Sequence, residues 1–274
     1  LARVWRSGTA ITMAVALGSS GVAAVQLLSV QDEVQIGRDA QAELRRSMPL
    51  VRDAEVRDYV SALGEELAGH ASGAAYPYSF SVADYSDLNA FALPGGPVWI
   101  NRGVLDAAQS EAQVAGVLAH EIAHVAGRHS ARQMTKGLWT SGILYVIGMV
   151  AYGSDDWRTQ AVALGSSLAA GTVMMKFSRN DEKAADRDGV RLLEQAGYDP
   201  RGLLDFMELL ERQDGRSRSS VARFFTTHPA PHDRVKTLTK LVESSPGGRP
   251  QGPDFLRLKR RLAQLPPATP MPIS

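Results

Sequence analysis

The sequence predicts a mainly α-helical fold with a small β-sheet, an arrangement of the α+β class. Two observations support this class. Apolar residues recur at helical spacing over 32–48, 54–70 and most of 111–212, while β-rich runs are confined to 76–84 and 97–101. The chain of 274 residues, 44% hydrophobic and 22% charged, can bury a sizeable core as one domain with tails, or as two small domains.

The N-terminal residues have the features of an export signal. Arg3 and Arg6 precede a mildly apolar stretch over 9–28, and small residues suited to cleavage lie at Val22-Ala23-Ala24. We therefore expect residues 1–30 to be a signal peptide or an N-terminal anchor. A signal peptide predicts a protein of the periplasm or cell envelope, and an anchor predicts a membrane-anchored one. A cytosolic amphipathic or disordered leader is the remaining alternative.

Residues 110–134 predict one helix that carries a histidine pair. Ser110 and Gln113 form a capping-box pattern, apolar residues follow at helical spacing, and nothing breaks the pattern before Lys136-Gly137. The helix contains His120-Glu121-Ile122-Ala123-His124, an HExxH sequence. Two imidazoles four residues apart lie on one face, about 6 Å apart along the axis, so both can reach one ion.

This spacing indicates a zinc metallopeptidase, because neutral imidazole is a preferred Zn²⁺ ligand. Glu121 can then act on water without binding the metal. The alternative is a helix whose two histidines lie on a solvated face, but that reading leaves an acid and two imidazoles without partners in an apolar run.

A catalytic zinc site needs a third protein ligand, and two segments supply candidates. The metzincin pattern HExxHxxGxxH is nearly followed, with Gly127 in place, but His129 comes one residue early and Ser130 stands where the histidine is required. One residue turns a side chain by about 100° around a helix, so we expect His129 on the surface.

The second candidate is a pair of acids. Glu182 and Asp186 are four residues apart on a predicted helix, and the small residues Ala184 and Ala185 allow close packing against another helix. One acid can bind metal while the other orients a ligand histidine. Taken alone, such an acidic stretch is typical of a solvated helix face.

The combined motifs resemble a known family. HExxH, then ExxAD beginning at Glu182, then His228-Pro229 with Arg234 six residues after the histidine, are similar to the CAAX prenyl protease and HtpX-like zinc metallopeptidases of peptidase family M48, most of all their soluble bacterial periplasmic branch. The resemblance covers about residues 31–243. It includes three further stretches: Glu33-Val34-Gln35-Ile36-Gly37, residues 89–96 and residues 225–229.

The resemblance implies a gluzincin-type metallopeptidase domain over 31–243, with roles for seven residues. One Zn²⁺ per chain would be bound by a three-residue set: His120, His124 and Glu182. The catalytic residues would be Glu121, His228 and Arg234, with Glu121 as general base and then acid. His228 would stabilise the oxyanion or approach the metal at rest, and Asp186 would orient a ligand histidine. His232 lies outside the matching positions and receives no role.

Two further segments carry expectations about substrate and membrane. Gly95-Gly96-Pro97 opens a β-rich run to Asn101, which suits an edge strand that pairs with an extended substrate; the alternative is an ordinary strand with Trp99 in the core. The apolar runs 138–152 and 161–175 each fall short of the 20 or so residues that span a bilayer. We expect a buried or membrane-dipping helical hairpin near the active site.

Composition excludes several other functions. A net charge of +1 gives no electrostatic case for nucleic acid, and the chain has no cysteine for a thiol nucleophile or disulfide. No G-x-S-x-G elbow is present. Residues 244–274 predict a linker, a short basic helix and a Pro-rich tail.

We therefore predict a zinc-dependent metalloendopeptidase that hydrolyses unfolded or misassembled cell-envelope proteins, in protein quality control. Its partners would be unfolded or misfolded polypeptides; a membrane-surface association is left open, and the sequence carries no signal for an oligomeric state. The alternatives are a chaperone-like binding protein with little turnover and a membrane-anchored processing protease.

Overall fold

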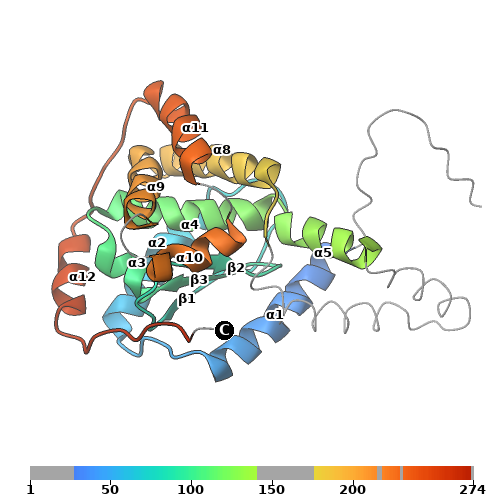
Figure 1. The fold of residues 1–274 in the computed structure, drawn as a ribbon, viewed down its shortest axis with the longest axis horizontal. Helices are drawn as coiled ribbons and strands as arrows, with labels where there is room; N and C mark the ends of the chain where they lie inside the picture. The colour runs from blue at the N-terminus through green and yellow to red at the C-terminus, as the bar shows by residue number, and fades with distance from the viewer. Residues whose placement is uncertain (1–27, 141–175, 215–217, 229–230, 273–274) are drawn as a thin grey trace, which may run out of the picture.

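The computed structural model describes residues 28–140, 176–214, 218–228 and 231–272, and it has the predicted mainly α fold with a small sheet (Figure 1). The predicted leader up to residue 27 and most of the two apolar runs lie outside the described residues. The elements are α1 (Val30–Ser47), α2 (Ala54–Ala68), β1 (Ser79–Ala83), β2 (Ala90–Ala92), β3 (Pro97–Asn101), α3 (Arg102–Ala107), α4 (Glu111–Ala126), α5 (His129–Thr140), α8 (Arg179–Gln195), α9 (Arg201–Asp214), α10 (Arg218–Thr227), α11 (Pro231–Glu243) and α12 (Phe255–Leu262).

The sheet has three strands in the order β1-β3-β2, with β1 parallel and β2 antiparallel to β3. The expectation that residues 97–101 form an edge strand is therefore wrong, because β3 is hydrogen-bonded on both sides. Gly95 and Gly96 have φ of 75° and 126° and form the tight turn from β2 into β3. The glycine pair thus serves a hairpin, and Trp99 is buried in the core, stacked on Phe91.

Helix α4 runs through the middle of the fold, with α8 and α9 on one side and α2 and the sheet on the other (Figure 1). Nearly every residue of α4 is buried, which fits its apolar sequence. Ser110 caps it by accepting a hydrogen bond from Gln113 N, but the Gln113 side chain accepts from Gln109 N, so the capping box is only half formed. Helix α4 is therefore held by neighbours on all of its sides.

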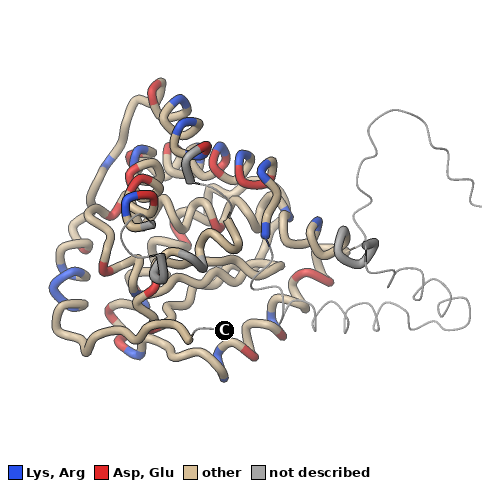
Figure 2. Tube along the Cα trace, viewed as in Figure 1, with Lys and Arg blue, Asp and Glu red and all other residues tan. Residues whose placement is uncertain are grey.

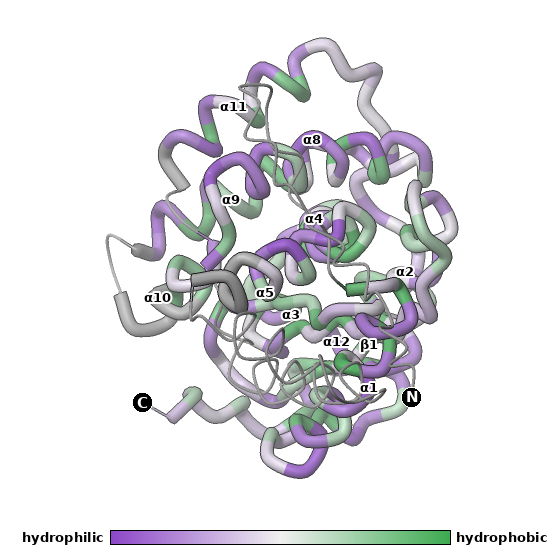
Figure 3. Tube along the Cα trace, turned by 90° about the vertical axis from the view of Figure 1, so that its right-hand side faces the viewer, coloured by the Kyte–Doolittle hydropathy of each residue, from purple (hydrophilic) through white to green (hydrophobic). Residues whose placement is uncertain are grey.

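The outer helices cover this centre with their polar faces outward. Figure 2 shows Lys, Arg, Asp and Glu spread along α8, α9 and α11, and Figure 3 shows the hydrophilic residues of α8 and α11 at the periphery. At the other end, α12 packs on α2 and α3 through buried Phe255, Leu258 and Leu262. No helix in the described part of the chain is long and apolar enough to cross a membrane.

The predicted single helix over 110–134 is broken in the structure. Helix α4 ends at Ala126 and α5 begins at His129, because Arg128 has a φ of 55°. That positive φ disfavours a non-glycine residue, and tertiary contacts hold it: the Arg128 guanidinium donates to Glu33 Oε1 at 2.6 Å and to Leu28 O at 2.6 Å. The helical pattern carries no sign of these contacts, which come from α1 and the residue before its cap.

Helix α1 also lies against the turn between β2 and β3. A Cβ on Gly37 would lie 1.9 Å from Pro94 O, and a Cβ on Gly95 would lie 2.4 Å from Val34 Cα. The backbones therefore approach too closely for any larger residue. Gly37 of α1 and Gly95 of the turn are therefore both required for α1 to pack against this turn.

Candidate active site

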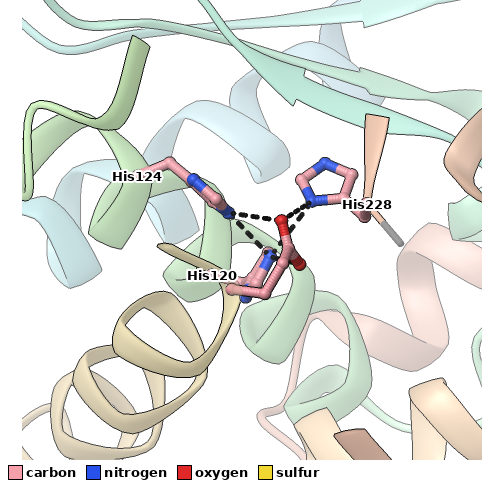
Figure 4. Close-up of side chains that lie close together, drawn as sticks. His120, His124 and His228 are labelled. Atoms are coloured by element: carbon pink, nitrogen blue, oxygen red, sulfur yellow. Dashed lines mark hydrogen bonds and ion pairs between the residues drawn. The ribbon is translucent and has the colours of Figure 1, made fainter. Parts of the chain in front are cut away.

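Four buried side chains converge at the inner face of α4 (Figure 4). His120 and His124 come from α4, Glu182 comes from the first turn of α8, and His228 directly follows α10. One ligand atom from each lies within 4.8 Å of the others, and none of the four residues is more than 1% exposed. The structure thus brings together four of the residues singled out in the sequence.

The distances between these atoms are short enough for all four to be ligands of one metal ion. The Nε2 atoms of His120 and His124 are 3.1 Å apart, and Nδ1 of His228 lies 3.0 Å from Glu182 Oε1 and 3.4 Å from His120 Nε2. Imidazole nitrogens and one carboxylate oxygen are the donors that Zn²⁺ takes in catalytic sites. The donor set therefore fits a single Zn²⁺ ion.

Two further residues predicted from the sequence, Asp186 and Arg234, contact the clustered side chains. Asp186 Oδ1 lies 3.1 Å from His120 Nδ1, the nitrogen that points away from the cluster. Arg234, in the first turn of α11, donates to both oxygens of Asp186 at 2.6 and 2.9 Å and lies 2.7 Å from Glu182 Oε2. One guanidinium therefore holds the two carboxylates that α8 presents at i and i+4.

Charge compensation controls the ionisation of these groups. Burial acts to raise the pKa of Glu182, but His228 and Arg234 outweigh it and lower that pKa well below its usual range. Asp186 shows the same balance, with Arg234 lowering its pKa against burial. Burial and Arg234 act to lower the pKa of His120, but hydrogen bonds to Asp186 and Glu182 raise it to about 9. Both carboxylates are therefore held ionised inside the protein.

Glu121 occupies a different position from the four clustered residues. It is fully buried, yet neither of its carboxylate oxygens has a hydrogen-bond partner among the residues that the structure describes. Nε2 of His228 lies 3.5 Å from Oε1 of Glu121, and this nitrogen also lacks a hydrogen bond within the described chain. Burying an unpaired carboxylate is costly, and such groups gather at functional sites.

The expectation that His129 lies on the surface is wrong. It is 2% exposed, and its Nδ1 lies 2.9 Å from Nδ1 of His124, on the side away from the cluster. Burial lowers the pKa of His129 to about 4, so the ring is neutral near pH 7. The break at Arg128 causes the difference, because α5 starts in a new direction and returns His129 towards α4.

Two aromatic residues at the site carried no signal in the sequence. Phe177 lies against His124, with ring centroids 4.0 Å apart, and Phe224 stacks on His228 at 4.7 Å. The Phe177 amide donates to Thr227 O at 3.0 Å, which joins the segment before α8 to the end of α10. Each phenylalanine fixes one imidazole by packing, a role that depends wholly on tertiary neighbours.

Comparison with known proteins agrees with this geometry. The beta-barrel assembly-enhancing protease of Escherichia coli (strain K12) is 32% identical over 222 residues, covering 80% of this chain and 45% of that protein. The one from Yersinia pestis is 29% identical over 246 residues, covering 88% and 50%. The mitochondrial metalloendopeptidase OMA1 of Saccharomyces cerevisiae is 33% identical over 157 residues, covering 56% and 43%.

The chain spans about half the length of the beta-barrel assembly-enhancing proteases that it matches. The model of peptidase family M48 matches residues 54–242, a range that runs from the start of α2 almost to the end of α11 and contains all the clustered side chains. With the family's sequence pattern covering more than half of the chain, and a buried His/Glu group at its centre, the chain belongs to peptidase family M48.

Proposed function

We propose that this chain is a zinc-dependent metalloendopeptidase in which His120, His124 and Glu182 hold one Zn²⁺. The observation that carries the proposal is the buried carboxylate of Glu121, which accepts no hydrogen bond within the described residues and lies beside the His/Glu cluster. A purely structural metal site has no use for such a group, whereas hydrolysis needs a base that is close to the metal but not bound to it.

A bound Zn²⁺ supplies Lewis acidity, which polarises a carbonyl group and lowers the pKa of a water molecule towards 7. Glu121 takes the proton from the attacking water and passes it to the nitrogen of the leaving amine, first as a base and then as an acid. Its carboxylate is free to do so because no described side chain donates to it. No covalent intermediate with the protein is required.

His228 and Arg234 receive different tasks. Nδ1 of His228 lies among the ligand atoms and its Nε2 faces Glu121, so the ring is placed either to complete the cluster at rest or to donate to the oxyanion during the reaction. Arg234 binds Asp186 and Glu182, so we assign it the orientation of both carboxylates. Asp186 in turn orients His120 through Nδ1.

As substrates we propose unfolded or misassembled proteins of the cell envelope. Support comes from the relatives named beta-barrel assembly-enhancing protease and from the signal-like residues 1–30. We propose the same division of the chain as the sequence suggests: a signal or anchor over 1–30, a metallopeptidase domain over 31–243, and a linker, basic helix and tail over 244–274. If residues 1–30 are a signal peptide, the protein is exported to the periplasm or cell envelope; if they are an anchor, it stays attached to the membrane.

Digestion of an unfolded model protein such as casein tests the activity. The wild type with zinc should cleave it, a chelator should stop cleavage, and Glu121→Gln should bind zinc but leave the substrate intact. Glu194→Gln, which changes an exposed carboxylate of α8, is the matched control and should cleave normally. Equal cleavage by wild type and Glu121→Gln would contradict the assignment of Glu121 as the general base.

The same assay separates the chaperone-like alternative. A binding protein would suppress aggregation of the unfolded substrate without cleaving it, and Glu121→Gln would leave that suppression unchanged, because binding needs no general base. Cleavage that depends on both zinc and Glu121 excludes this alternative.

N-terminal sequencing of protein from envelope fractions tests the location. If residues 9–28 belong to a cleaved signal, the mature protein should begin near Val25 and wash off membranes with salt or carbonate. An intact N-terminus that stays with the membrane would favour the anchored processing protease instead.

A further inference from the structure

We infer that His129 is a positioning residue: its Nδ1 accepts a hydrogen bond from Nδ1–H of His124 and so turns Nε2 of His124, with its lone pair, towards the clustered ligand atoms. The inference rests on the proposed metal site. It assigns a task to a buried histidine that is absent from the His/Glu cluster and that has no place in the reaction described above.

The argument begins with proton counting across the contact. The two Nδ1 atoms are 2.9 Å apart, so one must donate and the other must accept. The Nε2 of His124 lies 3.1 Å from His120 Nε2 and 3.5 Å from Glu182 Oε1, so this nitrogen faces the ligand cluster. A nitrogen that binds metal carries no proton, which places the proton of His124 on Nδ1 and makes His129 the acceptor.

The other histidine of α4 is arranged in the same way with a different partner. Nδ1 of His120 faces Asp186 Oδ1 at 3.1 Å, while its Nε2 faces the cluster. Each metal-side imidazole therefore has one acceptor behind it, a carboxylate for His120 and an imidazole for His124. An acceptor in this place fixes the tautomer and the ring orientation of a ligand histidine.

The backbone between the helices is shaped to return His129 to this position. The ring folds over Gly127, where a Cβ would lie 2.5 Å from Nε2 of His129, so only glycine leaves room for it. The positive φ of Arg128 makes the change of direction, and the buried Glu33 of α1 pairs with the Arg128 guanidinium. An imidazole placed by chance would not need a residue at positive φ that is held by a part-buried ion pair.

A second set of contacts holds the start of α5 against α8. Asp181, in the first turn of α8, accepts from Arg132 at 2.9 Å and from Gln133 at 2.9 Å. Asp181 directly precedes Glu182, so the helix that supplies the carboxylate of the cluster also holds the helix that carries His129. The residue before His129 is thus tied to α1, and the residues after it are tied to α8, a helix that builds the site.

To test the role of His129, we compare two substitutions that differ in whether they put a hydrogen-bond acceptor at the position of its Nδ1. In His129→Asn the side-chain oxygen can occupy the position of Nδ1 and accept the same hydrogen bond, whereas His129→Phe fills the space without an acceptor. The readout is zinc affinity of the full chain by competition with a chromophoric chelator, together with the thermal midpoint of the metal-free protein. His70→Phe, at an exposed histidine after α2, is the matched control.

We expect His129→Phe to lower zinc affinity by about 10- to 100-fold, His129→Asn to regain most of it, and His70→Phe to match the wild type. Unchanged affinity in His129→Phe overturns the inference. So does an equal loss in the Phe and Asn variants with a lowered metal-free midpoint, which would show a packing role. A wild type that binds zinc no better than Glu182→Ala overturns the proposed metal site itself, a result distinct from any difference confined to residue 129.

Discussion

At the scale of single residues, the site depends on atoms that face away from its centre as much as on those that face it. Arg234 contacts both Glu182 and Asp186, and Asp186 contacts the outer nitrogen of His120. Removing one of the two carboxylates leaves the guanidinium with a single carboxylate partner in a buried environment. The two carboxylates should therefore respond differently to substitution, although they lie on one helix face.

We predict that Glu182→Ala lowers zinc affinity more than Asp186→Ala does. The first change removes a ligand atom, and the second leaves all ligand atoms in place but frees the His120 ring to turn, an effect of about 10- to 100-fold. Chelator competition on purified variants measures both. Equal zinc occupancy in wild type and Glu182→Ala would contradict the assignment of Glu182.

We predict that His228→Ala keeps zinc bound but changes the turnover of an unfolded substrate. If the ring donates to the oxyanion, the rate should fall by about a hundredfold or more, and if it blocks the site at rest, the rate should rise. Steady-state kinetics with measured zinc content distinguishes the two directions. Unchanged kinetics would show that the stacked pair of His228 and Phe224 is structural.

How far the sequence predicts this site depends on how local each signal is. His120 and His124 lie one helical turn apart, as do Glu182 and Asp186, so periodicity alone places each pair on one face. The buried position of His129 is different. It follows from the positive φ of Arg128, whose partner Glu33 lies 95 residues earlier in the chain, and no local pattern carries that information.

At the scale of elements, helix ends are tied to distant parts of the chain. Asp53 caps α2 by accepting from Val56 N at 3.2 Å, and both nitrogens of the Arg261 fork donate to its Oδ2 at 2.6 and 2.8 Å. One carboxylate thus closes α2 and fastens the end of α12 to it. The hydrogen bond from Arg261 is the main cause of a lowered pKa for Asp53.

We predict that Asp53→Ala lowers the free energy of unfolding at neutral pH by about 1 kcal/mol from the lost cap. Because the pKa of Asp53 is depressed in the folded state, the stability from its charge is present above the ordinary value of 3.8 and is lost as pH falls through the folded pKa. Urea unfolding at several pH values measures it. Asp53→Ser, which keeps a cap but no charge, should restore the cap without the pH dependence.

The sheet shows why element order is harder to predict than element type. The β-rich run at 97–101 is a strand as predicted, but its place in the centre depends on two partners, β1 in parallel and the three-residue β2 in antiparallel. Strand β2 is too short to give a period-two pattern. The Gly95-Gly96 pair, which suggested the start of an edge strand, is instead the hairpin turn that joins β2 to β3.

At the scale of the whole molecule, the clustered side chains come from three parts of the chain. The proposed ligands lie on α4 and α8, so a bound ion fastens these two helices to each other, and His228 at the end of α10 completes the cluster. The leader and the apolar hairpin belong to residues outside the described part and stay predictions. The helical class could be predicted because periodicity is spread over most of the sequence.

We predict that zinc raises the thermal midpoint of the full chain and that a chelator lowers it. A ligand at a hundred times its Kd adds about 2.7 kcal/mol, which corresponds to about 5–10 °C for a domain of this size. Differential scanning calorimetry measures the shift. Glu182→Ala should show little response to the chelator, and an equal response in both proteins would place the stabilising ion elsewhere.

The distance along the chain between the clustered residues has a consequence for biosynthesis. His120 and His228 are 108 residues apart, and α8 and α9, which cover α4, are made after it. While the chain emerges, the histidine pair and Glu121 are present long before the partners that complete the cluster. We therefore expect the nascent polypeptide to have no peptidase activity until the segment up to α11 is free to fold, so that neither the growing chain nor its neighbours are cut during synthesis.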